Sequence, residues 1–153
     1  MRYALAAVLV LLTACATGGV GEPVVDAEMG TAPFALVSSG FVSGNPKYLS
    51  QTTTEEMTFV FRNVSETPQT AESLFVSQLN ETRSMFQVRR AVKRIHGVIA
   101  PGEELEVRVA ATVERTPRGE RGGMEMIELN LLLKHANGTT YRYAPVSPTY
   151  PRV

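Results

Sequence analysis

Few residues of this chain have the type and spacing that catalysis requires. Cys15 is the only cysteine among 153 residues, and His96 and His135 are the only histidines. A lone cysteine can act as a nucleophile, but Cys15 stands at the end of an apolar leader, where that role is not expected. With no second thiol to form a disulfide, the folded domain must be held together by its core alone.

Soft-metal binding is the other chemistry that these residues permit. Thioether and imidazole groups suit copper(I), and the candidate ligands are Met124, Met126, His96 and His135. A small metal carrier or enzyme built on them is the alternative reading. Methionine on a strand more often serves packing, and no zinc-protease, phosphate-loop or nucleophile-elbow motif is present. The favoured prediction is a chain that is not an enzyme and has no metal, cofactor or small-molecule substrate.

A run of basic residues is the main charged feature. No acidic residue lies between Glu81 and Glu103, and the formal net charge of the whole chain is zero. This balance gives no reason to expect nucleic acid as a partner. The basic residues of the run are Arg83, Arg89, Arg90, Lys93, Arg94 and His96.

Two interpretations of this run remain open. Arg89, Arg90, Lys93 and Arg94 could form a patch that attracts anionic lipid headgroups or an acidic partner. Alternatively, they are solvated side chains around inward-facing apolar residues and are neutralised by the glutamates of residues 103–106 on a neighbouring strand. The second interpretation is favoured. The apolar residues that it places inward are Phe86, Val88, Val92 and Ile95.

The leader explains the position of the cysteine. Met1-Arg2 is a basic start, residues 3–12 form an uncharged apolar run, and Thr13-Ala14 are small. This order is typical of a secretory signal peptide. The run is shorter than the ~20 apolar residues that span a bilayer. We therefore predict a signal peptide over residues 1–14, with cleavage between Ala14 and Cys15.

Leu12-Thr13-Ala14-Cys15 resembles the lipobox of bacterial lipoproteins. That resemblance implies lipidation of the Cys15 thiol and amine, which anchors the protein in a membrane because several acyl chains bind far more tightly than one. The small, breaker-rich residues 15–31 are expected to form a flexible tether. In enterobacterial lipoproteins an aspartate after the cysteine retains the protein in the inner membrane. Ala16 therefore favours the outer membrane, facing the periplasm, over the inner membrane or the cell surface.

The remaining residues, 32–153, are predicted to form one all-β domain. Val107 and Val109 alternate with charged residues, which is the period of a strand with one buried face. Met57, Phe59 and Phe61 alternate with Thr58, Val60 and Arg62 in the same way. Further strands are predicted at 127–133 and, after an Asn137-Gly138 hairpin, at 139–143. Shorter candidates are 34–42, 74–79 and 85–89, while residues 89–96 fit either a helical turn or a strand. About seven strands indicate an antiparallel, immunoglobulin-like β-sandwich.

A second resemblance covers about residues 55–135. A Phe-x-Phe-x-Asn strand end at 59–63 is followed by Phe86-Gln87-Val88 and by a Pro101-Gly102-Glu103 turn before an alternating strand. This order resembles bacterial immunoglobulin-like domains of the abnormal-spindle/hydin type, which mostly scaffold or bind. Pro and Gly at the centre of that turn also predict a type II turn on their own. The function expected from both resemblances is a non-catalytic binding or accessory module of a bacterial envelope complex, with a protein partner there.

Overall fold

The computed structural model describes residues 32–42, 52–81, 84–115 and 126–149. These residues form strands, turns and bends and no helix, so none of them provides a helix that is long and apolar enough to cross a membrane. The strands are β1 (Phe34–Phe41), β2 (Thr53–Asn63), β3 (Gln69–Gln78), β4 (Phe86–Val88), β5 (Ala91–Arg94), β6 (Val98–Ile99), β7 (Glu104–Arg115), β8 (Leu129–His135) and β9 (Thr140–Val146).

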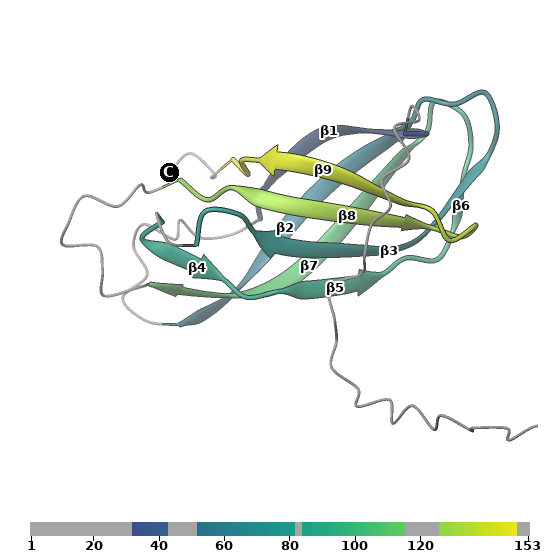
Figure 1. Ribbon diagram of the computed structural model, residues 1–153. Coiled ribbons are helices and arrows are strands. Elements are labelled where there is room, and N and C mark those ends of the chain that lie inside the picture. The colour runs from purple at the N-terminus through teal and green to yellow at the C-terminus, as the bar shows by residue number, and fades with distance from the viewer. Residues whose placement is uncertain (1–31, 43–51, 82–83, 116–125, 150–153) are drawn as a thin grey trace, which may run out of the picture.

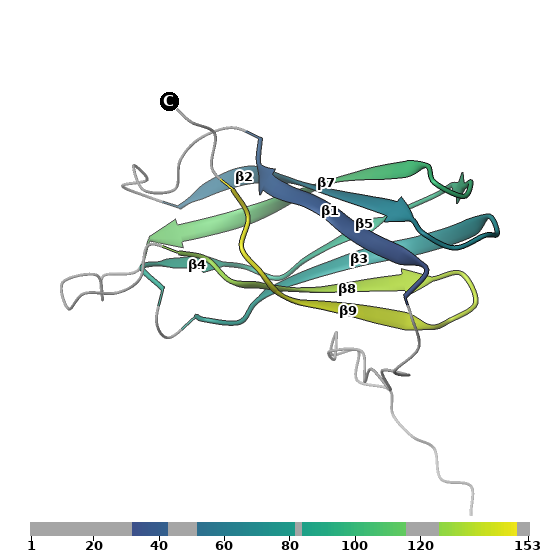
Figure 2. The same ribbon diagram turned by 90° about the horizontal axis from the view of Figure 1, so that it is seen from above.

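The strands form two sheets that pack face to face (Figures 1 and 2). One sheet has the order β1-β2-β7-β4, and the other has the order β5-β3-β8-β9 with β6 also paired to β3. All pairings between these strands are antiparallel. The prediction of an antiparallel β-sandwich is confirmed. The strand count exceeds seven because the chain after β4 forms the two short strands β5 and β6.

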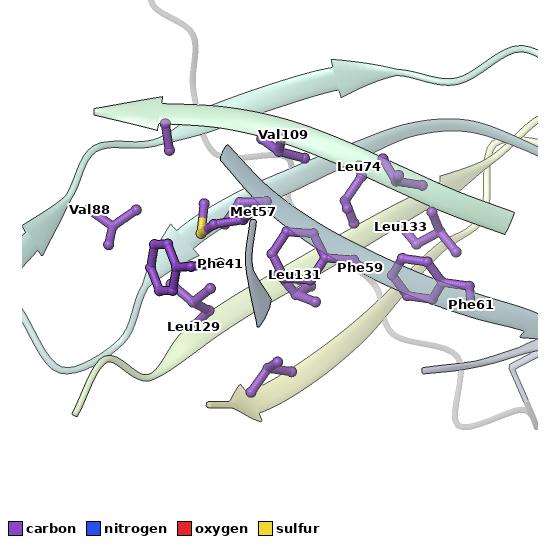
Figure 3. Packing of buried hydrophobic residues seen from close by; sticks show 14 of the residues in the cluster. Phe41, Met57, Phe59, Phe61, Leu74, Val88, Val109, Leu129, Leu131 and Leu133 are labelled. Carbon is purple, nitrogen blue, oxygen red and sulfur yellow. The ribbon is translucent and has the colours of Figure 1, made fainter. Parts of the chain in front are cut away.

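The core lies between the sheets and follows the predicted alternation. Phe59 pairs with Val107 across β2 and β7, and both side chains are at most 3% exposed. Leu131 from β8 contributes to the same core cluster from the other sheet (Figure 3). Each such side chain contributes roughly 1.5–3 kcal/mol when fully buried. The register of these strands is therefore fixed, because a slip by one residue would expose the whole apolar set.

A second apolar contact lies on the outer face of the β5-containing sheet. Phe75 on β3 pairs with Leu132 on β8. Both side chains are buried, yet neither belongs to the core cluster, to which their neighbours Leu74 and Leu133 contribute. Since successive strand residues point to opposite faces, Phe75 and Leu132 cover the outside of this sheet.

Both predicted glycine turns are present. Gly102 has φ +78°, and the Glu103 amide donates to the Ala100 carbonyl at 3.1 Å, as a type II turn requires. In the β8–β9 hairpin only Gly138 has a positive φ, of 92°, and the Gly138 amide donates to the His135 carbonyl. This pattern is a three-residue loop in which a type I turn is followed by a glycine bulge.

The chain after β9 returns to the first sheet. Thr149 pairs with Gly40 of β1 in parallel, through a bond from the Phe41 amide to the Thr149 carbonyl at 2.9 Å. A Cβ atom on Gly40 would lie 3.0 Å from the Thr149 hydroxyl oxygen. Glycine at position 40 therefore permits this close approach, which covers part of the β1 edge.

Candidate binding surface

The predicted lipidation site Cys15, the cleavage position after Ala14 and the tether at residues 15–31 all lie outside the described residues. They stay predictions from the sequence. The described sandwich begins at residue 32, and the basic run is largely visible within it, apart from Arg83.

The basic run lies where the chain crosses from one sheet to the other. β4 pairs with β7 in the first sheet, and β5 pairs with β3 in the second (Figure 1). Arg89 and Arg90 lie between these two strands in the sequence. Residues 89–96, whose sequence fits either a helical turn or a strand, contain the strand β5. This strand belongs to the opposite sheet from β4.

A buried amide network fixes the start of the crossover. The Gln78 side chain donates to the Phe86 carbonyl at 2.9 Å and accepts from the Val88 amide at 2.7 Å. Asn80 accepts from Gln78 at 3.0 Å and donates to the Met126 carbonyl at 2.9 Å. These bonds join β4 to the second sheet, because Gln78 on β3 bonds the Phe86 and Val88 main-chain groups on the edge of β4 that faces away from β7. The role of Gln78 is not visible in the sequence, since an isolated glutamine in a strand carries no motif.

Arg89 is neutralised by a neighbouring strand. Its Nε atom lies 2.8 Å from Oε1 of Glu114 on β7. The hydrogen bond to Glu114 and the charge of that carboxylate raise the pKa of Arg89 above its ordinary value. Arg89 therefore contributes less free positive charge to the surface than its position in the run suggests.

Arg90, Lys93 and Arg94, here called the edge cations, form no ion pair within the described part of the chain. The prediction that glutamates of residues 103–106 neutralise the run is wrong. Glu104 pairs with Arg62, Glu106 pairs with Arg108 at 2.6 Å, and Glu103 accepts from the Ala100 amide at 3.0 Å. The register of β7 with β2 brings Glu104 to Arg62, whereas Glu106 and Glu103 find their partners within β7 and in the preceding turn.

Strand alternation distributes the edge cations over two faces. Lys93 pairs with the core residue Leu74, so both side chains point toward the first sheet, and Lys93 is exposed there at the open side of the sandwich. Arg94 and Val92 point to the outer face, where Val92 pairs with Phe75. Arg90 lies in the crossover and is exposed. The four predicted patch residues therefore surround a strand instead of forming one flat patch.

The prediction that Val92 faces inward is wrong, although Phe86, Val88 and Ile95 are buried as expected. Val92 is 59% exposed and Val98 is 69% exposed, which are the two largest values among the exposed large hydrophobic residues that the structure describes. Val92 is exposed because it points to the outer face of β5, which is the last hydrogen-bonded strand of its sheet among the described residues.

β5 and β6 together form one edge of the second sheet, called the β5–β6 edge and comprising residues 91–99. β5 pairs with Ser73–Val76 of β3, and β6 pairs with Gln69–Thr70 of the same strand. A depression of about 420 Å³ adjoins the start of this edge and is lined by Glu81, Gln87, Val88, Arg89 and Arg90. The candidate surface thus combines unpaired cations, exposed valines and an open strand.

The structure does not assemble the candidate copper ligands. Met124 lies outside the described residues, and Met126 precedes β8 while His135 ends it. Nine residues of extended chain span roughly 30 Å. His96 is exposed and follows β5 on the other side of β3 from His135. Among the described residues, no three His, Cys, Asp or Glu side chains are grouped as metal ligands either.

His135 instead has a structural environment. Its Nε2 atom lies 2.8 Å from Oε1 of Gln69, whose amide nitrogen donates to Ser65 and Thr67. The Gln69 oxygen must therefore accept, which assigns the proton of a neutral His135 ring to Nε2. The ring packs against Phe34 and Tyr141. His135 is thus a buried residue at the end of β8, held through its Nε2 atom by Gln69.

Two solved structures resemble the chain at low identity. A FixG-related protein from Vibrio parahaemolyticus is 14% identical, with a TM-score of 0.40, over 80% of this chain and 100% of that one. A Bordetella pertussis protein described as ApaA is 16% identical, also with a TM-score of 0.40, over 81% of this chain and 100% of that one. No family model matches the chain. No curated protein matches it either, so the resemblance to the abnormal-spindle/hydin type stays a prediction and no family is assigned.

Proposed function

We propose that this chain is a lipid-anchored protein of the bacterial envelope whose β-sandwich is a non-catalytic binding module for another envelope component. The observation that carries the binding role is the β5–β6 edge. Three unpaired cations and the two most exposed valines of the described residues lie on or beside a strand with an open side.

The structural use of three buried side-chain amides, those of Asn63, Gln78 and Asn80, supports a non-catalytic role. Asn63 donates to the Thr67 and Ile99 carbonyls, each at 2.9 Å, and accepts from the Ser65 amide. Gln78 and Asn80 bond β4 and the residues before β8 in the same manner. These amides are engaged in joining strands, which is a structural use of polarity.

The anchoring part of the proposal rests on the sequence Leu12-Thr13-Ala14-Cys15. A thioether-linked diacylglyceryl group and an acylated amine on Cys15 would hold the protein at a membrane. Ala16 after the cysteine favours the outer membrane, facing the periplasm, by resemblance to enterobacterial lipoproteins. The tether at 15–31 would let the sandwich reach partners away from the bilayer surface.

Anchoring is tested by labelling cells that express the full chain with a palmitate analogue. Wild type is expected to incorporate the label and to fractionate with membranes, whereas Cys15→Ala should do neither. Ala16→Ser, which keeps the cysteine and a small neighbour, is the matched control and should behave as wild type. An unlabelled wild type, or a Cys15→Ala protein that is processed and labelled as before, would exclude lipidation.

The binding role is tested by copurification from crosslinked envelopes. The wild-type full chain is expected to retain a specific partner, and the association should weaken as salt rises because exposed charges are screened over ~8 Å at physiological ionic strength. Recovery of the same proteins by wild type and by a heat-unfolded sample would show that no specific binding occurs.

A further inference from the structure

We propose that the β5–β6 edge binds an extended acidic polypeptide segment, which adds to the second sheet as a further strand beside β5. This inference rests on the proposed function, because it specifies how the binding module recognises its partner. Strand addition to an open edge uses main-chain hydrogen bonds for affinity and side-chain contacts for specificity.

The backbone of β5 has hydrogen-bonding groups directed toward the open side. The Ile95 amide donates to the Glu72 carbonyl at 2.8 Å, in register with the β3–β5 pairs. Residues of an antiparallel strand alternate between bonded and non-bonded pairs. Ala91 and Lys93 therefore direct their N–H and C=O groups to β3, whereas Val92 and Arg94 direct theirs away from it.

The other three sheet edges, formed by β1, β4 and β9, are less suited to the addition of a strand. The β1 edge is contacted by the backbone of Thr149 at Ser39 and Phe41. The β4 edge has only the three residues Phe86–Val88. The remaining edge, β9, contains Pro145, which has no amide hydrogen to donate. Neither β1, β4 nor β9 contains a valine as exposed as Val92.

The charge of the edge selects against a second copy of this chain. An exposed strand with apolar side chains invites pairing with an identical edge, and lysine on the strand is one way in which proteins prevent it. Two β5 edges would bring Lys93 and Arg94 close to the same residues of the partner. An acidic strand is attracted by the charges that repel an identical edge.

The arrangement of side chains indicates the pattern of the incoming strand. Val92 continues the outer-face contact of Phe75 with Leu132, so the residue opposite Val92 should be apolar. Arg94 lies on the same face as Val92, and Lys93 lies on the other. Acidic residues are therefore expected on both faces of the incoming strand, at neighbouring positions. A layer of lipid headgroups would approach only one of these faces, so the geometry favours a polypeptide.

The test measures binding of labelled synthetic peptides to the purified full-length protein in neutral detergent by fluorescence anisotropy. The acidic probe is acetyl-Thr-Val-Glu-Glu-Thr-Val-Thr-amide, and its control has lysine at both glutamate positions. A third peptide keeps the acidic sequence but is N-methylated at alternate residues, which removes the amides on one edge of a strand. The acidic peptide is expected to bind at least about tenfold more tightly than either control, a difference of ~1.4 kcal/mol.

Two variants probe the edge, and one variant serves as a matched control. Arg90→Glu with Lys93→Glu should weaken binding at least about tenfold by reversing charge, and Val92→Pro should do so by removing an outward amide without breaking a β3 bond. Arg142→Glu reverses an exposed arginine on β9, at the opposite end of the same sheet, and should bind as wild type. Circular dichroism of each variant reports whether it is folded.

Several outcomes would overturn the inference. Equal binding of the N-methylated peptide would mean that charge alone is recognised. No saturable binding by roughly 1 mM acidic peptide, or equal binding by the edge variants and wild type, would also exclude strand addition. Strand addition would also be excluded if the peptide does not bind but the edge cations are required for another association. That association could be salt-sensitive binding to phosphatidylglycerol vesicles or formation of a dimer. If Val92→Pro does not fold, the N-methylated peptide still shows whether main-chain hydrogen bonds are needed for binding. If the protein is palmitate-labelled, membrane-bound and copurifies a partner but does not bind the acidic peptide, the proposed function stands and strand addition is excluded.

Discussion

The hydroxyl of Tyr143 donates a hydrogen bond to the main-chain carbonyl of Phe34 at 2.7 Å. Tyr143 lies on β9 in one sheet and Phe34 begins β1 in the other, so this bond joins the two sheets at one side of the sandwich. The Tyr143 ring also packs edge-on against Phe61, with ring centroids 5.3 Å apart. The contact therefore fixes the position of β1 relative to the core.

Tyr143→Phe removes this bond and retains the ring. The free energy of unfolding is expected to fall by about 1–2 kcal/mol, because the Phe34 carbonyl loses one partner in a partly buried site. Urea denaturation followed by circular dichroism would measure the change. Tyr141→Phe is the matched control on the same strand and should change stability by less than about 0.5 kcal/mol. Equal effects of the two variants would mean that the Tyr143 hydroxyl does not hold β1.

The same tyrosine predicts a loss of stability in alkali. Burial, and to a smaller extent the nearby Tyr141, raises the pKa of Tyr143 well above its ordinary value. The unfolded chain releases this proton near pH 10, while the folded chain retains it. The contribution to stability is thus complete below about pH 10 and is lost progressively as the pH rises further.

This pH dependence can be measured by urea denaturation at about pH 8 and about pH 11. Wild type should lose more stability over this interval than Tyr143→Phe, in which the titrating group is absent. Tyr141→Phe should follow wild type. Parallel losses in wild type and Tyr143→Phe would show that other groups cause the alkaline destabilisation.

The crossover between the sheets depends on Gln78. Gln78→Ala leaves the Phe86 carbonyl and the Val88 amide without their side-chain partner in a buried site. We expect a loss of about 2–4 kcal/mol in the free energy of unfolding, since each unsatisfied buried group costs about 1–3 kcal/mol. Thermal and chemical melts would record it. Gln87→Ala, at an exposed position on β4, should have little effect, and a comparable loss there would contradict this role for Gln78.

The inward face of β7 is tested by a pair of neighbouring residues. Val107→Asp places a charge at a site that is 3% exposed, and the cost should exceed ~4 kcal/mol, enough to unfold the domain. Arg108→Asn removes only exposed ion pairs with Glu106 and Glu56, which are worth about 1 kcal/mol or less. Similar melting curves for the two variants would mean that the register of β7 is wrong.

The sequence by itself determined the strands whose two faces differ. Val107 and Val109 alternate with charged residues because one face of β7 meets the core and the other meets water, so the period is visible locally. Pro101-Gly102 likewise determined its turn, because proline presets φ and glycine accepts a positive one. The all-β class and the core residues of β2, β7 and β8 could be predicted for these reasons. The run of cations after Gln87 was also evident.

Only the tertiary structure decided which cations of that run are paired and which of its side chains are exposed. The sheet order places β5 at an end of its sheet, so Val92 is exposed although its sequence context resembles that of buried valines. Glu114 pairs with Arg89 and Glu104 pairs with Arg62, because the pairing of β7 with β4 and β2 sets which charges meet. Gln78 acquires its role only when β4 lies against it. These relationships join residues distant in sequence, and no local period or motif encodes which strands become neighbours.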